Sequence, residues 1–156
     1  MRIETVGYDH PDSKKLIDAL QLEYVVRYGE EDVTVVDPVE FQPPNGLFLV
    51  GYRDGLAVAS GGWRIHDGKE SGFRDGDAEI KRMYIVPEAR GNGLARRLLA
   101  ELETTASLAG RKRLVLETGT RQPEAISLYT SSGYTEMEKF GVYRDDPLSR
   151  CFAKDL

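Results

Sequence analysis

The feature that most constrains the fold is one stretch in the middle of the chain, Ala78–Leu99, with the sequence AEIKRMYIVPEARGNGLARRLL. It joins an apolar strand to an amphipathic helix through a turn that contains two glycines. The first N–H groups of a helix have no partner inside the helix, and the helix dipole adds about half a positive charge there. Glycine before such an end lets a ligand approach the backbone closely. The stretch therefore predicts a site for phosphate or pyrophosphate beside a strand.

The turn matches neither of two common nucleotide-binding motifs. A P-loop needs Lys followed by Ser or Thr after its second glycine, and neither pair follows these glycines. A dinucleotide fingerprint needs three spaced glycines in an early βαβ unit, whereas this turn lies in mid-chain. A Gly-x-Gly turn alone also fits a tight connection between strand and helix. The residues around the turn must therefore show whether it is an anion site or only a tight connection between strand and helix.

Composition narrows the class of protein. With 156 residues the chain is expected to form a single domain over residues 1–156 that buries roughly 70% of its unfolded surface. A net charge of −5 argues against a nucleic-acid partner, which usually binds a basic surface. The one cysteine, Cys151, excludes an internal disulfide and fits a packed strand residue. The chain shows neither the apolar core of a signal peptide nor about 18 consecutive apolar residues, so we expect a cytoplasmic protein without a membrane partner.

Periodicity and turn residues predict a mixed α/β fold, with one sheet and helices on both of its faces. The expected order is strand, helix, irregular connection, three strands, helix, strand, helix and two strands. The expected strands are Arg2–Tyr8, Leu47–Tyr52, Leu56–Ile65, Asp77–Val86, Arg113–Glu117, Tyr134–Met137 and Ser149–Lys154. The expected helices begin at Pro11, Asn92 and Pro123, end before Gly29, Gly110 and Gly133, and leave Glu30–Pro44 as an acidic, Pro-rich connection.

Two strings of the sequence carry a family resemblance. Arg90–Ala95 reads R-G-x-G-x-A, which is similar to the acyl-CoA motif of the GNAT superfamily of N-acetyltransferases. Gln122–Tyr134 is similar to the family string N-x-x-A-x-x-L-Y-x-x-x-G-F, and departs from it at its first and last residues. The tail, Phe140–Tyr143 followed by Pro147–Phe152, further resembles a small bacterial subgroup. Because the order of elements also matches, the resemblance covers nearly the whole chain.

The resemblance implies the GNAT fold and its chemistry. In that fold the central sheet is mostly antiparallel, and its fourth and fifth strands, here Asp77–Val86 and Arg113–Glu117, splay apart to admit the pantetheine arm. The implied activity is transfer of an acetyl group from acetyl-CoA to a primary amine of a small molecule or peptide, by direct attack in a ternary complex. The alternative is a catalytically silent module that binds CoA and regulates. A homodimer is left open, and two distant histidines with one cysteine cannot make a zinc site.

The resemblance also assigns residues to acetyl-CoA. Backbone N–H groups of the fourth strand would hold pantetheine and bond the acetyl oxygen, and those of the glycine turn would hold the pyrophosphate. Gln122 stands where the family has an Asn that often bonds pantetheine, although it equally fits a helix cap. The candidate cofactor-binding residues are Met83, Tyr84, Ile85, Val86, Arg90, Gly91, Asn92, Gly93, Leu94, Ala95, Arg96, Gln122 and Tyr129.

Three residues are candidates for catalysis. Tyr129 matches the family's tyrosine that protonates the departing thiolate, although an aromatic on an apolar helix face also fits a core residue. Glu79 and Glu117 match base positions of different family branches, and each also fits a structural salt bridge. Strand alternation predicts that the Glu79 and Met83 side chains share one face of the sheet. We favour Glu79, or a water chain that touches both carboxylates.

The acceptor is less constrained by the sequence. Five acidic residues of the connection favour a cationic acceptor or simply form a solvated surface: Glu30, Glu31, Asp32, Asp37 and Glu40. Trp63 and Tyr143 are candidates for the acceptor pocket, although Trp63 on a strand also fits the core.

Overall fold

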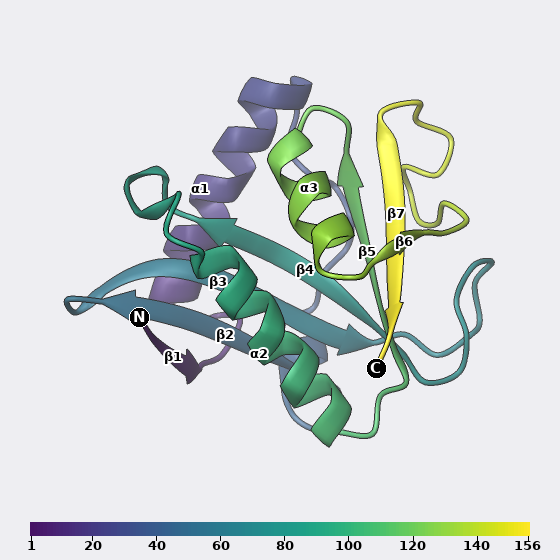
Figure 1. The fold of residues 1–156 in the computed structure, drawn as a ribbon, viewed down its shortest axis with the longest axis horizontal. Coiled ribbons are helices and arrows are strands. Elements are labelled where there is room, and N and C mark those ends of the chain that lie inside the picture. Colours follow the sequence, from purple (N-terminus) through teal and green to yellow (C-terminus); the bar gives the residue numbers. More distant parts are fainter.

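The computed structural model describes every residue, Met1–Leu156, and contains one seven-stranded sheet in the order β1-β2-β3-β4-β5-β7-β6 (Figure 1). The order of helices and strands along the chain is the expected one. The strands are β1 (Arg2–Thr5), β2 (Gly46–Arg53), β3 (Leu56–Ile65), β4 (Asp77–Ile85), β5 (Arg113–Gly119), β6 (Thr135–Glu136) and β7 (Ser149–Asp155). The first and the sixth strand are shorter than expected, and β5 is two residues longer.

The sheet is antiparallel except where β4 meets β5. These two strands are parallel, and they pair only over Asp77–Glu79 and Arg113–Val115. Beyond that point β4 continues to Ile85 beside β3, and β5 continues to Gly119 beside β7. Figure 1 shows the two strands diverging from their common start. The expected splay is therefore confirmed, and it leaves one edge of β4 without a strand partner.

Three α-helices and two short 3-10 helices complete the fold: α1 (Pro11–Tyr28), η1 (Pro38–Phe41), η2 (Pro87–Ala89), α2 (Leu94–Leu108) and α3 (Pro123–Ser131). The His10 side chain caps α1 by accepting from the Asp12 N–H, and Gly29 ends it at a φ of 85°. The α2 helix begins two residues later than expected. Gly93 adopts a φ of 74°, a left-handed conformation that cannot form part of a right-handed helix. None of the helices is both long and apolar enough to cross a membrane.

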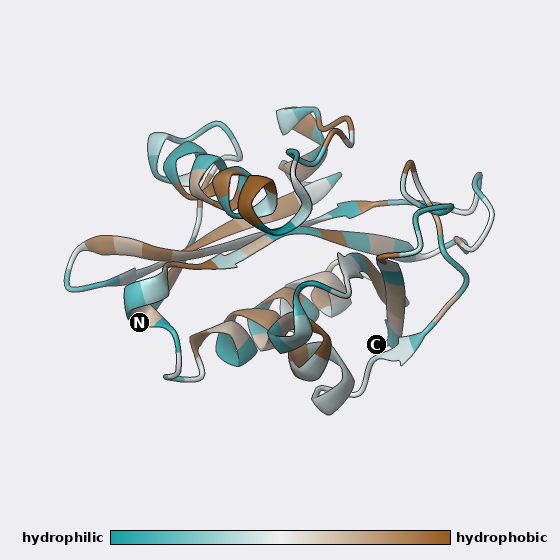
Figure 2. Cartoon of the chain, turned by 90° about the horizontal axis from the view of Figure 1, so that it is seen from above, coloured by the Kyte–Doolittle hydropathy of each residue, from teal (hydrophilic) through white to brown (hydrophobic).

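The helices cover both faces of the sheet, as expected (Figure 2). Leu16 and Leu20 of α1 pack with Phe41 of η1 on one face. On the other face Leu98 and Leu102 of α2 pack against the sheet, together with residues of α3. Figure 2 shows the sheet nearly edge-on between these two layers. The opening between β4 and β5 is thus roofed by α1 on one side and by α3 on the other.

A β-bulge in β4 changes which face its side chains occupy. The register with β3 shifts between Ser60 and Gly62, and Arg82 adopts a φ of 62°. After the bulge Met83 packs with the α2-side core, whereas Glu79 contacts an arginine on the α1 side. The expectation that Glu79 and Met83 share a face is therefore wrong, because the bulge adds one residue to the alternation.

Replacing Leu102, which is 0% exposed in the α2-side core, with Ala should lower the free energy of unfolding by about 2–5 kcal/mol. The loss has two parts, the lost burial of the side chain and the cavity left behind. Leu108 on the same helix is 83% exposed, so Leu108→Ala should change the free energy of unfolding by about 0.5 kcal/mol or less. Urea denaturation of both variants measures the difference. Equal losses in the two would contradict this placement of α2.

Candidate functional site

A pocket opens where β4 and β5 separate. Its empty volume is about 1030 Å³ when counted out to solvent. Both strands contribute walls, and the C-terminal end of α1, the segment after it, α3 and the loop before β7 supply the rest. The residues that matter below are Tyr24, Tyr28, Asp32, Lys81, Arg82, Met83, Glu117, Gln122, Tyr129, Tyr143 and Ser149.

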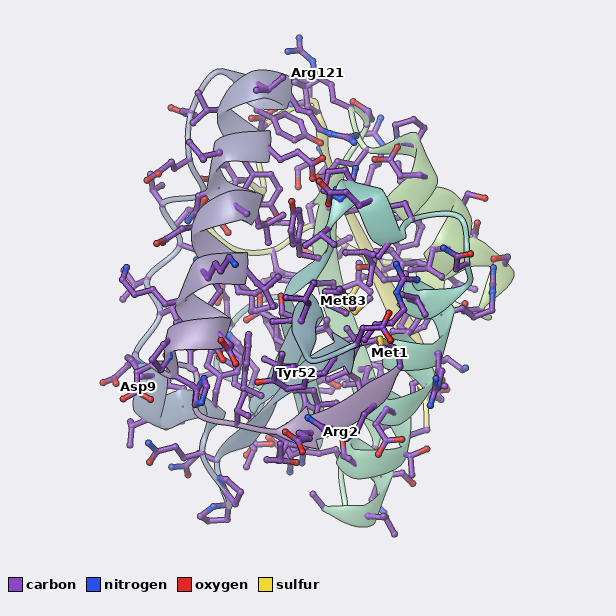
Figure 3. All side chains as sticks on the ribbon, turned by 90° about the vertical axis from the view of Figure 1, so that its left-hand side faces the viewer. Met1, Arg2, Asp9, Tyr52, Met83 and Arg121 are labelled. Carbon is purple, nitrogen blue, oxygen red and sulfur yellow. The ribbon has the colours of Figure 1, made fainter.

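The free edge of β4 supplies backbone groups to this opening. The Val86 N–H donates to the Val58 carbonyl oxygen of β3 at 2.9 Å. Since N–H groups alternate along a strand, those of Tyr84 and Val86 face β3, and those of Met83 and Ile85 face the opening. Only two of the four expected backbone donors are therefore available to a ligand. In Figure 3 Met83 lies between the α1 side and the α2 side of the molecule.

The glycine turn after β4 forms an open cradle at the start of α2. Gly91 and Gly93 adopt φ values of 83° and 74°, and nothing lies within 4 Å of the place where a Cβ would be. No side chain caps α2, so the first N–H groups of the helix, at Leu94–Arg96, have no helical partner. The geometry fits a bound anion such as pyrophosphate.

The two arginines of this segment bind protein groups. Arg90 donates from Nε to the Ile85 carbonyl oxygen at 2.9 Å and from Nη2 to Glu23 of α1. Arg96 donates to the hydroxyls of Ser131 and Ser132 at the end of α3. Both side chains therefore hold the walls of the opening in place.

Tyr129 of α3 lines the pocket and is 6% exposed. Burial alone raises the pKa of its phenol above the ordinary value. Its ring packs edge-on against Tyr134, with centroids 5.7 Å apart. Tyr129 is thus packed in the core and also presents a protonated hydroxyl to the pocket. The structure is therefore compatible with both interpretations of this residue, the core residue and the proton donor.

Glu117 of β5 points its carboxylate into the same pocket. Burial raises its pKa to about 7, and the neighbouring Lys81 ammonium partly opposes that shift. Glu117 Oε2 is buried and has no hydrogen-bond partner, and the same holds for Ser149 Oγ on the next strand. A carboxyl group that lines a cavity and titrates near neutral pH can take a proton from a ligand.

Glu79 lies in a different environment, although it was the favoured base. It is buried, and Oε1 accepts hydrogen bonds from Arg64 Nε at 3.1 Å and Nη2 at 3.0 Å. It does not line the pocket. The structural salt bridge that the sequence also allowed for Glu79 is therefore present, with Arg64 as its partner, whereas Lys81 bonds Asp32 and Arg113 bonds Asp77.

Gln122 stands at the start of α3 but its side chain does not cap the helix. Its Oε1 accepts a hydrogen bond from the Tyr28 hydroxyl of α1 at 3.0 Å. The cap interpretation is therefore wrong, and the amide lies at the pocket wall. Tyr143 lines the pocket as expected, whereas Trp63 is a core residue whose Nε1 donates to Thr105.

The acidic connection divides into two parts. Glu30, Glu31 and Asp32 line the pocket, whereas Asp37 caps η1 and Glu40 accepts from Arg64. No group of three His, Cys, Asp or Glu side chains is placed to hold a metal ion.

Sequence reasoning missed both cations of the pocket, Lys81 and Arg82. Both donate to Oδ2 of Asp32, at 3.3 and 3.0 Å, and the two cations together with a backbone hydrogen bond hold the Asp32 pKa at about 2 against its desolvation. The available signal was a pair of adjacent cations inside the otherwise apolar strand IKRMYI.

The comparisons with known proteins agree with this fold. The family model described as "Acetyltransferase (GNAT) family" matches residues 13–134. An IAA acetyltransferase of Azospirillum brasilense is 38% identical over 129 residues, covering 83% of this chain and 80% of the relative. The crystal structure of a putative acyl-CoA N-acyltransferase from Klebsiella pneumoniae has a TM-score of 0.79 at 31% identity, covering 99% of this chain and 97% of the other. The PaiA N-acetyltransferase of Thermoplasma acidophilum, solved in complex with coenzyme A, has a TM-score of 0.72 at 18% identity, with 100% of both chains covered.

Glu117→Gln should raise the melting temperature at pH 8. The folded-state pKa of Glu117 lies above its unfolded value of 4.5, so its contribution to stability is fully present below pH 4.5 and is lost as pH rises through about 7. Glutamine removes that loss, and the gain over the parent should shrink at pH 5. Differential scanning calorimetry at both pH values measures the effect.

Glu79→Gln is the matched control, because it weakens the buried bond to Arg64 and should lower the melting temperature at both pH values. A Glu117→Gln protein that is less stable than its parent at pH 8 would show that the Glu117 carboxylate is favourably paired.

Proposed function

Because the chain belongs to the acetyltransferase (GNAT) family, we propose that it transfers the acetyl group of acetyl-CoA to a primary amine. The observation that carries this proposal is the pocket between the splayed strands β4 and β5. It brings together an unpaired strand edge, a buried tyrosine hydroxyl on Tyr129 and a carboxyl group on Glu117 that titrates near neutral pH.

The residues present fit acetyl-CoA, which supplies an activated acetyl thioester when bound. The cradle of Gly91 and Gly93 and the first N–H groups of α2 would hold the pyrophosphate. The backbone of Met83 and Ile85 would hold the pantetheine arm as a strand partner holds its neighbour. Gln122 at the pocket wall offers an amide to the same arm. The structure of PaiA N-acetyltransferase with coenzyme A shares this fold and supports the assignment.

Each of three groups then has a separate task. Glu117 accepts a proton from the acceptor ammonium, because its pKa near 7 lets it do so at neutral pH. The Met83 N–H donates a hydrogen bond to the acetyl oxygen, on which negative charge develops. Tyr129 donates its hydroxyl proton to the departing thiolate. The amine nitrogen attacks the thioester carbon directly, so that a C–N bond forms as the C–S bond breaks. The proton that remains in excess on the nitrogen then returns to the Tyr129 phenolate, and Glu117 releases its own proton to solvent.

We assign the base to Glu117 in preference to Glu79. The Glu79 carboxylate is bound by Arg64 on the α1 side of the sheet and lies outside the pocket. Glu79 instead holds Arg64, which also bonds the segment after α1 through the Val35 carbonyl oxygen.

A panel of primary amines tests the proposed function. The protein, acetyl-CoA and each amine are mixed, and release of free CoA thiol is followed beside mass spectrometry of the acceptor. Acetylation of at least one amine supports the enzyme. Binding of CoA without release of thiol for any amine would support the alternative, a silent CoA-binding module.

Tyr129→Phe should lower turnover by about 10²–10⁴-fold while leaving CoA affinity unchanged, because only the proton donor is removed. Tyr134→Phe is the matched control, since this second buried tyrosine bonds Glu103 and lies outside the pocket. Turnover and CoA binding by calorimetry are measured for both variants. Equal turnover of the Tyr129 variant and the parent would leave that tyrosine a core residue only.

The pH profile of turnover distinguishes the two carboxylates. In the parent protein, turnover at saturating acetyl-CoA should rise with pH through about 7 as Glu117 loses its proton. Glu117→Gln should lose most activity at low pH and least in the alkaline range, where free amine is abundant. Glu79→Gln should keep the parent's profile shape. A profile that flattens in the Glu79 variant instead would move the base to β4.

A further inference from the structure

We propose that the acceptor is amino-acid-like, with a carboxylate beside its amine, and that Lys81 and Arg82 bind this carboxylate. The inference rests on the proposed function and names the substrate class of that site. The buried charges inside the pocket indicate this substrate class, and the exposed acidic residues that also line the pocket play no part in the inference.

The pocket wall holds two buried cations, and one anion to which both of them are bound. Lys81 is 8% exposed and Arg82 is 7% exposed, and both share one oxygen of Asp32. The other oxygen of Asp32 already accepts from the Thr34 N–H at 2.9 Å. Burying a charge without a counter-charge is costly, so the second cation calls for an anionic partner.

The nearby carboxylates do not supply that partner throughout the reaction. Glu79 is bound by Arg64, and an ionised Glu117 balances the second cation only until it takes a proton from the amine. Glu30, Glu31 and Asp146 line the mouth of the pocket but are exposed to water, where an ion pair contributes little. Once Glu117 has taken the proton of the amine, the interior therefore carries one excess positive charge. A ligand carboxylate would cancel it.

Hydrogen-bonding capacity agrees with the charge count. The Lys81 ammonium has three donors and a single protein partner, Asp32. Arg82 uses Nε on the Tyr8 hydroxyl and Nη1 on Asp32, and Nη2 has no protein partner. Both residues line the pocket, so these two side chains still have donors to offer a ligand there.

The bulge in β4 is what brings the two cations together. Adjacent residues of a regular strand point to opposite faces, yet Lys81 and Arg82 reach the same carboxylate oxygen. Arg82 does so with a φ of 62°, a conformation that costs a non-glycine residue energy. Strained backbone of this kind is concentrated at functional sites. Here it aims two donors at one place.

One small molecule can reach both groups. Lys81 and Glu117 line the same pocket, so a single ligand can present a carboxylate to Lys81 and an amine to Glu117. An α-amino carboxylate has this arrangement. The simpler alternative is that the two cations only anchor the segment after α1 through Asp32.

Matched pairs of acceptors test the inference. Methionine, phenylalanine and glutamine are each compared with their α-amides, which keep the amine and side chain but lack the carboxylate. The ratio of kcat/KM, acid over amide, is measured for the parent, Lys81→Met and Lys15→Met. Lys15 is exposed on α1 and serves as the matched control. Differences in amine basicity are the same for every variant and cancel when the variants are compared. The ratios are measured in the alkaline range, where both amines are unprotonated, so that a changed Glu117 pKa does not alter them.

Lys81→Met should lower this ratio by about tenfold or more, as expected for loss of a charge-assisted hydrogen bond, and Lys15→Met should leave it unchanged. Asp32→Asn removes the competing anion and should raise the ratio. Calorimetry of the N-acetylated acid and amide with CoA bound should give the same order without any catalysis. An unchanged ratio in both pocket variants, in a protein that acetylates amines, would overturn the inference and leave the cations as an anchor. Failure to acetylate any amine would overturn the proposed function instead, whatever the product-binding data show.

Discussion

The pocket depends on one buried ion pair at the point where β4 and β5 begin. Arg113 donates to both carboxylate oxygens of Asp77, at 2.8 and 2.7 Å, and these two residues are also the first register pair of the strands. A bidentate pair of this kind fixes geometry as well as charge. Because pairing is held at this end and stops after Glu79, the twist of the sheet carries the strands apart further along. The site forms in the resulting gap.

The open end of the gap is braced by contacts between α1 and the start of α3. Arg27 bonds Glu124, and Arg27 and Arg121 each donate to the other's carbonyl oxygen. Figure 3 shows Arg121 at the end of the molecule where α1 ends. Tyr28 lies over Gly119, where any side chain would collide with its hydroxyl. The two sides of the gap are thus joined both at the apex and at the mouth, which keeps the space between them at a defined width.

The buried carboxyl group of the pocket lowers the stability of the fold and provides a reactive group. A carboxylate with a free buried oxygen at Glu117 costs folding free energy when it is ionised. An apolar side chain at this position would avoid the cost. Such arrangements are found where proton transfer or charge recognition is needed. The same physical reason explains why Glu79, fully paired with Arg64, belongs to the supporting structure.

The sequence by itself determined the order of helices and strands, the glycine turn before α2, and the choice of Tyr129 and Glu117 as candidates for catalysis. Its family resemblance also predicted the splay of β4 and β5. These predictions rest on local signals: periodicity, glycines at turns, and motif strings that need no distant partner. Tertiary structure alone decided the roles of the carboxylates and of the cations in β4. A bulge one residue long moved Met83 to the other face, and Arg64, fifteen residues from Glu79, took that carboxylate as its partner. Desolvation and ion pairing depend on what surrounds a side chain in three dimensions, and strand alternation cannot reveal an inserted residue.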